Sequence, residues 1–100
     1  MKIDIDRRVI LALNTLKKRE INEVNENLRQ FNSEFNKKAS IIRKNIGKNP
    51  LVRMISEGSE RRLYSYGKDN RIKLIFSIPK SAEDEISVVD IAYPEQVEKE

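Results

Sequence analysis

Basic side chains and tyrosines recur through the second half of the chain in positions that suit contact with a polyanion. Arg71 and Lys73 lie two residues apart in a segment with a two-residue apolar period, so a strand would place both on one face. Arg61 begins a neighbouring segment of the same kind, and Tyr93 ends a later one. Cations beside aromatic rings bind phosphodiesters and unstacked bases. The residues that we expect to share one such face are Lys73, Arg61, Arg71 and Tyr93.

A second group of residues is expected to contact nucleic acid around that face: Arg62, Tyr64, Lys68, Lys48 and Arg53. An equally open interpretation is structural, because Lys and Arg on a strand edge keep a protein soluble and discourage pairing between sheets. The residue pattern by itself does not separate these two interpretations.

Several kinds of chemistry are excluded by composition. The chain has no Cys and no His, which rules out disulfides, thiolate or imidazole zinc sites, Cys nucleophiles and Ser-His-Asp arrangements within it. Its three glycines form no phosphate-binding loop. Glu83, Asp84 and Glu85 are adjacent on a polar loop and cannot keep the fixed spacing of an acid–base pair. A metal site built only from Asp and Glu stays open, but no residue pattern points to one. We expect no metal and no cofactor.

The net charge of +4 conceals an uneven distribution. Residues 37–80 hold twelve basic and three acidic residues, whereas residues 81–100 hold one basic and seven acidic residues. A basic centre beside an acidic C-terminal segment indicates a polyanionic partner. The acidic segment either shields the basic centre or lies away from it.

The elements that must position these side chains fit one domain over residues 1–100. Residues 2–6 alternate polar and apolar, as in a short strand, and Asp6 can cap a helix that begins at Arg7. That helix is expected to end in the basic cluster 17–19, where cations oppose the helix dipole. Apolar residues at steps of three and four then predict a helix over about 20–36, and 37–46 should add a further helical turn or two.

The remaining chain changes to a strand-like period. Strands are predicted over 61–66, 71–78 and 86–92, with a tight turn at 67–70, and residues 51–58 have no clear assignment. The predicted fold is α+β: an N-terminal strand, a helical hairpin, and then a three-stranded antiparallel sheet whose one face the hairpin covers.

This order of elements resembles the RelE/ParE superfamily of bacterial and archaeal toxins. The local similarity lies in residues 63–66 (LYSY), 73–76 (KLIF) and 86–93 (ISVVDIAY). Members similarly show a basic-tyrosine strand, a turn, a basic-apolar-apolar-aromatic strand, and a last strand near "VxDI". The resemblance covers most of the chain and implies a single RelE/ParE-like domain. The basic segment 37–53 of this chain has no counterpart in the family.

The resemblance implies the toxin of a type II toxin–antitoxin pair, a metal-independent endoribonuclease that cuts messenger RNA on the ribosome. The ribose 2′-oxygen attacks its own phosphate, which leaves a cyclic phosphate. Lys73 stands where the family carries a functional Arg, so the resemblance gives it the role of stabilising the phosphate, with Arg61 or Arg71 sharing the charge. Tyr93 would position or deprotonate the 2′-hydroxyl, for which cations must lower its phenol pKa from about 10. The implied partners are a cognate antitoxin and the ribosome with its mRNA.

Other functions stay open at this point. ParE-like members bind and poison DNA gyrase, and a catalytically silent RelE-fold module would only bind a partner. The family often has His-Arg or Lys-Arg where this sequence has Tyr93-Pro94, which keeps both alternatives in view. A third is a nucleic-acid-binding accessory factor that oligomerises through the helix at 20–36.

The expected location is the cytoplasm. No apolar run approaches the ~20 residues that span a bilayer, and residues 1–6 lack the apolar core of a signal peptide. We therefore expect no membrane partner.

Overall fold

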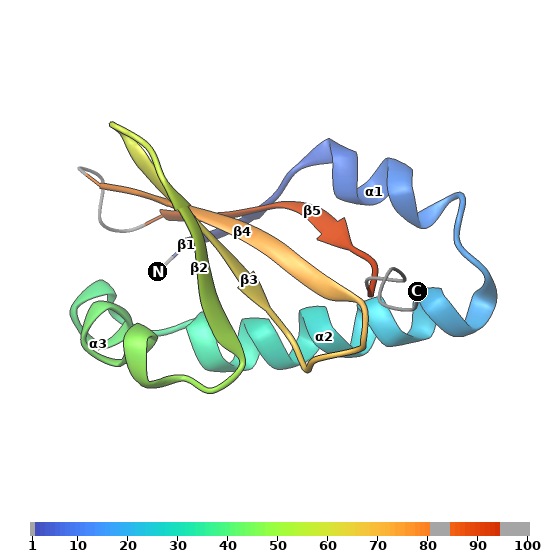
Figure 1. Ribbon diagram of the computed structural model, residues 1–100, viewed down its shortest axis with the longest axis horizontal. Coiled ribbons are helices and arrows are strands. Elements are labelled where there is room, and N and C mark those ends of the chain that lie inside the picture. Colours follow the sequence, from blue (N-terminus) through green and yellow to red (C-terminus); the bar gives the residue numbers. More distant parts are fainter. Residues whose placement is uncertain (1, 81–84, 95–100) are drawn as a thin grey trace, which may run out of the picture.

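A computed structural model describes residues 2–80 and 85–94 of the 100-residue chain. The elements in chain order are β1 (Lys2–Ile5), α1 (Arg7–Leu13), α2 (Lys18–Phe35), α3 (Ala39–Asn45), the 3₁₀ turn η1 (Ile46–Lys48), β2 (Val52–Glu57), β3 (Arg61–Tyr66), β4 (Lys73–Pro79) and β5 (Glu85–Ala92) (Figure 1). Glu83 and Asp84 of the predicted acidic loop, and the acidic residues after Pro94, lie outside the described residues.

All five strands form one mixed sheet in the order β1-β5-β4-β3-β2. β1 runs parallel to β5, and the other neighbours are antiparallel. The predicted α+β class and the N-terminal strand are confirmed, but the sheet gains β2, which the sequence did not predict. A β-bulge between Met54 and Ser56 interrupts the two-residue period of β2, and most of this edge strand is exposed.

The joint between the first two helices lies earlier than predicted. Asp6 caps α1 by accepting a hydrogen bond from the Arg8 backbone N–H at 2.8 Å. The basic cluster 17–19 was expected to end this helix, and that expectation is wrong: α1 ends at Leu13, and the cluster begins α2. The Lys17 N–H donates to Glu20 Oε1 at 2.9 Å, which fixes the start of α2.

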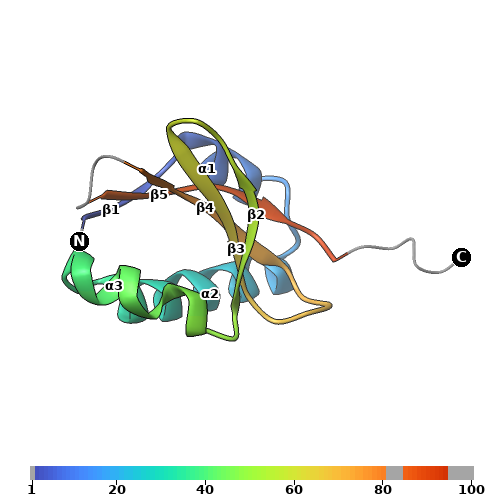
Figure 2. The ribbon, with the colours of Figure 1, turned by 60° about the vertical axis from the view of Figure 1, so that its left-hand side comes forward.

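The core lies between the sheet and the helices. Val9 of α1 and Val24 of α2 are both fully buried in one cluster, with α1 packed against β5 and α2 against β4 (Figures 1 and 2). Phe31 of α2 stacks on Phe35 with ring centroids 4.4 Å apart, and it meets Phe76 of β4 at 5.0 Å. Each large side chain buried in this way contributes roughly 1.5–3 kcal/mol to folding. The apolar stripe predicted for the second helix is therefore confirmed as the core face of α2.

The sheet has a second face that points away from α2, here called the open face. Because side chains alternate along a strand, Leu74 and Phe76 of β4 are buried toward α2, and their neighbours point the other way. The open-face residues of β2, β3 and β4 that matter below are Arg53, Arg61, Leu63, Ser65, Lys73, Ile75 and Ser77. Among the described helices, none has the length and apolar character needed to cross a membrane.

Candidate nucleic-acid interface

The four residues expected on one face are divided between two sides of the sheet. Lys73 lies on the open face, whereas Arg71 precedes β4 and lies on the α2 side, with Nη1 3.9 Å from Glu23 Oε2. Tyr93 lines a groove with Arg71 on that same side. The expectation of one shared face is wrong because α2 holds Ile72: Glu23 accepts from its N–H at 3.2 Å, and Asn27 donates to its carbonyl at 2.7 Å. These bonds keep residues 71 and 72 out of the sheet.

Arg61 shares the open face with Lys73 but lies at the opposite end of it. Arg61 pairs with Pro79 across the β3–β4 ladder, six residues along β4 from Lys73. At a rise of ~3.3 Å per residue, the two backbones are roughly 20 Å apart. The Arg61 Nε donates to Ser77 Oγ at 2.9 Å, which keeps its side chain at that end.

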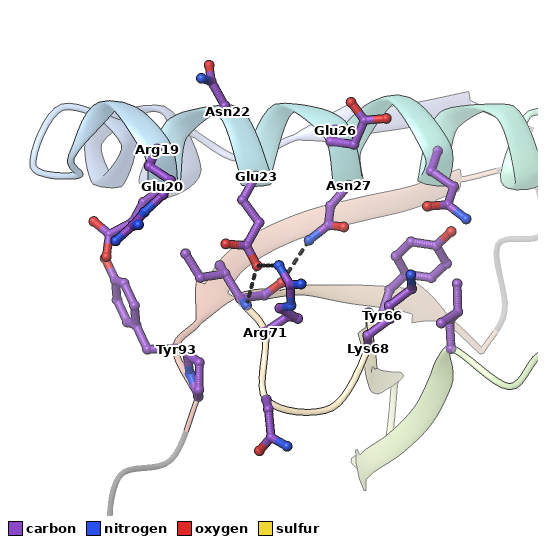
Figure 3. Close-up of a pocket in the computed structure, with 16 residues that line it drawn as sticks. Arg19, Glu20, Asn22, Glu23, Glu26, Asn27, Tyr66, Lys68, Arg71 and Tyr93 are labelled. Carbon is purple, nitrogen blue, oxygen red and sulfur yellow. Dashed lines mark hydrogen bonds and ion pairs between the residues drawn. The ribbon is translucent and has the colours of Figure 1, made fainter.

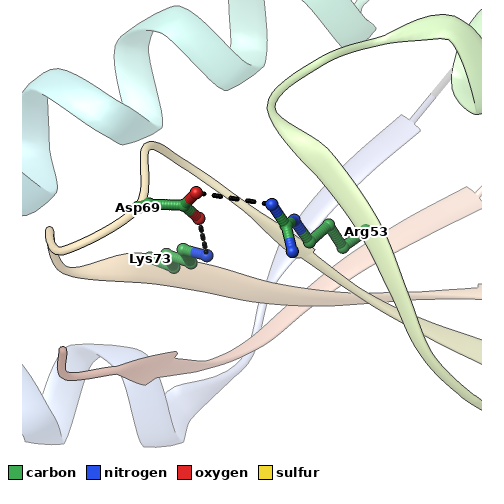
Figure 4. A network of polar contacts seen from close by, with 3 residues as sticks. All are labelled: Arg53, Asp69 and Lys73. Carbon is green, nitrogen blue, oxygen red and sulfur yellow. Dashed lines mark hydrogen bonds and ion pairs between the residues drawn. The ribbon is translucent and has the colours of Figure 1, made fainter. Parts of the chain in front are cut away.

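Lys73 belongs to a small cluster of charges, here called the open-face cluster, that also contains Arg53 and Asp69 (Figure 4). The Lys73 Nζ lies 3.1 Å from Asp69 Oδ1, and Arg53 Nη2 lies 3.3 Å from Asp69 Oδ2. The hydrogen bond from Lys73 and the charge of Arg53 lower the pKa of the Asp69 carboxyl. Two cations from different strands thus converge on one anionic group.

The turn before β4 sets the position of Lys73. Gly67 has φ +146°, a conformation that side chains rarely adopt, and a Cβ added there would lie 3.1 Å from Lys73 Cγ. Asn70 takes the left-handed conformation with φ +64°. The turn therefore leaves room beside Lys73 and brings Asp69 over its amine.

On the α2 side, the same turn forms the wall of a groove of about 930 Å³, here called the turn groove (Figure 3). Lys68, Arg71 and Tyr93 line it from the sheet side, and three acidic residues of α2 line it from the helix side: Glu20, Glu23 and Glu26. The Glu23–Arg71 pair crosses it (Figure 3). The turn groove is therefore mixed in charge, unlike the cationic surface expected around Arg71 and Tyr93.

The other residues expected to contact nucleic acid are dispersed. Tyr64 is a correction: its ring is buried and stacked on Phe76 with centroids 5.2 Å apart, because β3 turns it toward α2. Arg62 binds Glu57, which also contacts Lys80, and hydrogen bonds from Lys80 and Arg62 lower the Glu57 pKa. Arg53 joins the open-face cluster, Lys68 lines the turn groove, and Lys48 lies on η1.

Sequence reasoning missed Asp69, Glu23 and Asn27. Asp69 was interpreted only as part of a turn, although a carboxylate four residues before Lys73 across a tight turn is a usable signal for an ion pair. Glu23 and Asn27 lie 49 and 45 residues from Ile72, so only tertiary structure joins them.

The cluster is suited to binding one anionic group between Arg53 and Lys73, since both cations already face a carboxylate there. Across residues 2–80 and 85–94, no group of three or more metal-binding side chains is placed to hold an ion.

Comparisons with known proteins agree with the architecture. No family model and no curated protein matches the sequence. A chain in the crystal structure of the archaeal RelE–RelB complex from Pyrococcus horikoshii OT3 is similar, with a TM-score of 0.57 and 16% sequence identity. The match covers 96% of this chain and 97% of that chain. The chain thus has a RelE-like fold, as the sequence resemblance implies.

Proposed function

We propose that the chain is the toxin of a type II toxin–antitoxin pair and that it cleaves messenger RNA on the ribosome without a metal. The observation that carries the proposal is the open-face cluster, in which Arg53 and Lys73 converge on one anionic group within a RelE-like fold. The similar archaeal structure is a RelE–RelB complex, which supports an antitoxin as a partner of this chain.

The proposed reaction needs cations at one phosphate. The 2′-hydroxyl oxygen attacks phosphorus and gives its proton to a water molecule, the P–O5′ bond breaks, and the 5′-oxygen takes a proton from water. The products are a 2′,3′-cyclic phosphate and a 5′-hydroxyl. Negative charge grows on the phosphate oxygens in the transition state, and fixed cations stabilise that charge. Lys73 and Arg53 supply the cations once the phosphate takes the place of the Asp69 carboxylate.

Arg71, Tyr93 and Arg61 receive more distant roles in this proposal. Lys73 pairs with Ala92 across the β4–β5 ladder, so Tyr93 follows directly after the partner of Lys73. An RNA strand that leaves the open-face cluster around this end of the sheet meets Tyr93 and Arg71 next. Arg61, at the far end, contacts another phosphate of the same strand.

The test compares two lysines that are both ion-paired and partly exposed. The Lys73 side chain is 21% exposed beside Asp69, and the Lys80 side chain is 32% exposed beside Glu57. Purified ribosomes programmed with a labelled mRNA are mixed with the wild type, Lys73→Met or Lys80→Met. We expect mRNA cleavage by the wild type and Lys80→Met, and a loss of roughly 100-fold in Lys73→Met. Equal cleavage by both variants would remove Lys73 from the mechanism.

A second candidate is a RelE-fold module that binds its target without cutting RNA. The separation of Arg61, Arg71 and Tyr93 from Lys73 favours it, because the expected catalytic set does not share one face. Expression in bacterial cells separates the candidates. Growth arrest with fragmented mRNA supports the nuclease, arrest with DNA breaks and inhibited supercoiling supports a gyrase inhibitor, and harmless expression supports the silent module.

A further inference from the structure

Helix α3 and the turn η1 lie beside the C-terminal end of α2 (Figure 2). Residues of these elements line a second groove. It has a volume of about 380 Å³ and is here called the α3 groove. Apolar side chains dominate its lining: Phe35, Ile41, Ile42, Ile46, Pro50 and Leu51. Ile41 is 43% exposed, whereas Ile42 next to it is buried. Helix α3 thus presents apolar surface at Ile41, while its neighbour Ile42 packs into the core.

The segment that forms most of the α3 groove is strongly basic. Residues 35–51 contain no acidic residue and five basic residues, which are Lys37, Lys38, Arg43, Lys44 and Lys48. Lys37 and Lys48 line the groove directly. The acidic residue in the lining is Glu34, and both of its carboxylate oxygens accept hydrogen bonds, from Asn49 at 2.8 Å and from Tyr66 at 2.9 Å. A partner therefore meets an apolar floor with a positive rim.

This combination favours a protein segment over RNA. An RNA strand would need exposed rings for its bases, and the aromatic ring among the described lining residues belongs to Phe35, which is 3% exposed. An amphipathic helix, by contrast, places apolar residues in such a groove while its flanks remain polar. Flanks rich in Glu and Asp would match the basic rim.

We propose that the α3 groove is a docking site for an acidic amphipathic helix of a partner protein. Apolar side chains of that helix cover Ile41, and its carboxylates face Lys37 and Lys48. The site is separate from the open-face cluster, so the proposal holds whether or not the chain cleaves RNA.

A designed peptide tests the docking site directly. The probe is a fluorescein-labelled helix of roughly 20 residues with Leu on one face and Glu on the other. Its fluorescence anisotropy is measured against the full-length protein at low and high salt. We expect binding that is tighter than about 1 mM, that weakens with salt, and that is absent for the same peptide with Lys in place of Glu.

Two matched variants place the binding in the groove. Ile41 and Ile10 are both exposed, at 43% and 54%, and each lies on a seven-residue helix. We expect Ile41→Glu to weaken peptide binding at least ~10-fold, because it puts a carboxylate on the apolar floor, and Ile10→Glu to leave binding unchanged. Lys48→Glu should weaken binding as well.

Three results would overturn the proposal. One is the absence of peptide binding, and another is equal loss in Ile41→Glu and Ile10→Glu. The third is a labelled single-stranded RNA that binds in an Ile41-dependent way, which would assign the groove to nucleic acid. None of these readouts involves mRNA cleavage, so the α3 groove and the nuclease can fail independently.

Discussion

The two faces of the sheet are held by interactions of different strength. On the side that faces α2, Phe31 is 1% exposed and contacts three aromatic rings, with centroids 4.4 to 5.2 Å away. In the open-face cluster, the side chains of Arg53 and Asp69 are each about two-thirds exposed, and the side chain of Lys73 is 21% exposed. Buried aromatic contacts contribute several kcal/mol, whereas exposed ion pairs contribute about 0–1 kcal/mol. The face toward α2 therefore supplies most of the stability of the two. On the open face, a ligand can replace the Asp69 carboxylate at little cost in stability.

The largest effect should come from Phe31→Ala, which removes the ring at the centre of the aromatic core. We expect a loss of about 3–5 kcal/mol in the free energy of unfolding, because the neighbouring rings cannot close the cavity. Urea unfolding followed by circular dichroism measures it. Ile55→Ala is the control, since Ile55 is 51% exposed on the edge strand and should change stability by less than about 0.5 kcal/mol. Equal losses in the two variants would show that the α2 face is not the main source of stability.

Gly67→Ala should have the next largest effect. Gly67 lines the turn groove on the α2 side and also lies against Lys73, whose side chain is on the open face. Its positive φ disfavours any side chain, and the new Cβ would press on Lys73 Cγ at 3.1 Å. We expect a loss of about 1–3 kcal/mol in unfolding free energy together with weaker RNA cleavage. Gly47→Ala is the matched control, since a Cβ there meets nothing within 4 Å. Full stability in Gly67→Ala would mean that the turn relaxes and does not fix Lys73.

Tyr66→Phe tests a polar contact between the core face of the sheet and α2. The Tyr66 hydroxyl donates to Glu34 Oε2 at 2.9 Å, and its removal should cost about 1–2 kcal/mol at neutral pH. Burial, then the contact with Glu34, raises the pKa of Tyr66 above its ordinary value of 10.0. The folded state therefore prefers the protonated phenol. This contribution is complete below pH ~10 and is lost as the pH rises toward the folded-state pKa.

Chemical denaturation from pH 7 to 11 measures this dependence. The stability of the wild type should fall more steeply above pH ~10 than that of Tyr66→Phe, which has no phenol to ionise. Parallel pH profiles for the two proteins would contradict the buried Tyr66–Glu34 contact.

The sequence predicts the α2 face better than the open face, and the reason is periodicity. The core stripe of α2 and the buried alternation of β4 repeat over many residues, so Val24, Phe31 and Phe76 could be assigned without coordinates. The bulge at Ile55 interrupts the two-residue period in β2, so the strand that carries Arg53 could not be predicted from the sequence. Alternation also extended β4 back to Arg71, because hydrogen bonds from α2 to Ile72 have no local signature. The candidate site was therefore predicted in part: Lys73 was placed correctly on the open face, but its companions are Arg53 and Asp69.

The smallest predicted effect concerns Asp69 and tests whether the open-face cluster exists in solution. Lys73 and Arg53 lower the Asp69 pKa below its ordinary value of 3.8, so the ionised carboxylate favours the folded state. That stability is present above the unfolded-state pKa and is lost as the pH falls through the folded-state pKa, and it is small because the group is exposed. Carbon-detected NMR titration of the side-chain carboxyl should show the lowered pKa in the wild type and a rise in Lys73→Met and in Arg53→Met. An ordinary pKa in the wild type would mean that the two cations do not converge on Asp69, and the open face would then offer no ready site for a phosphate.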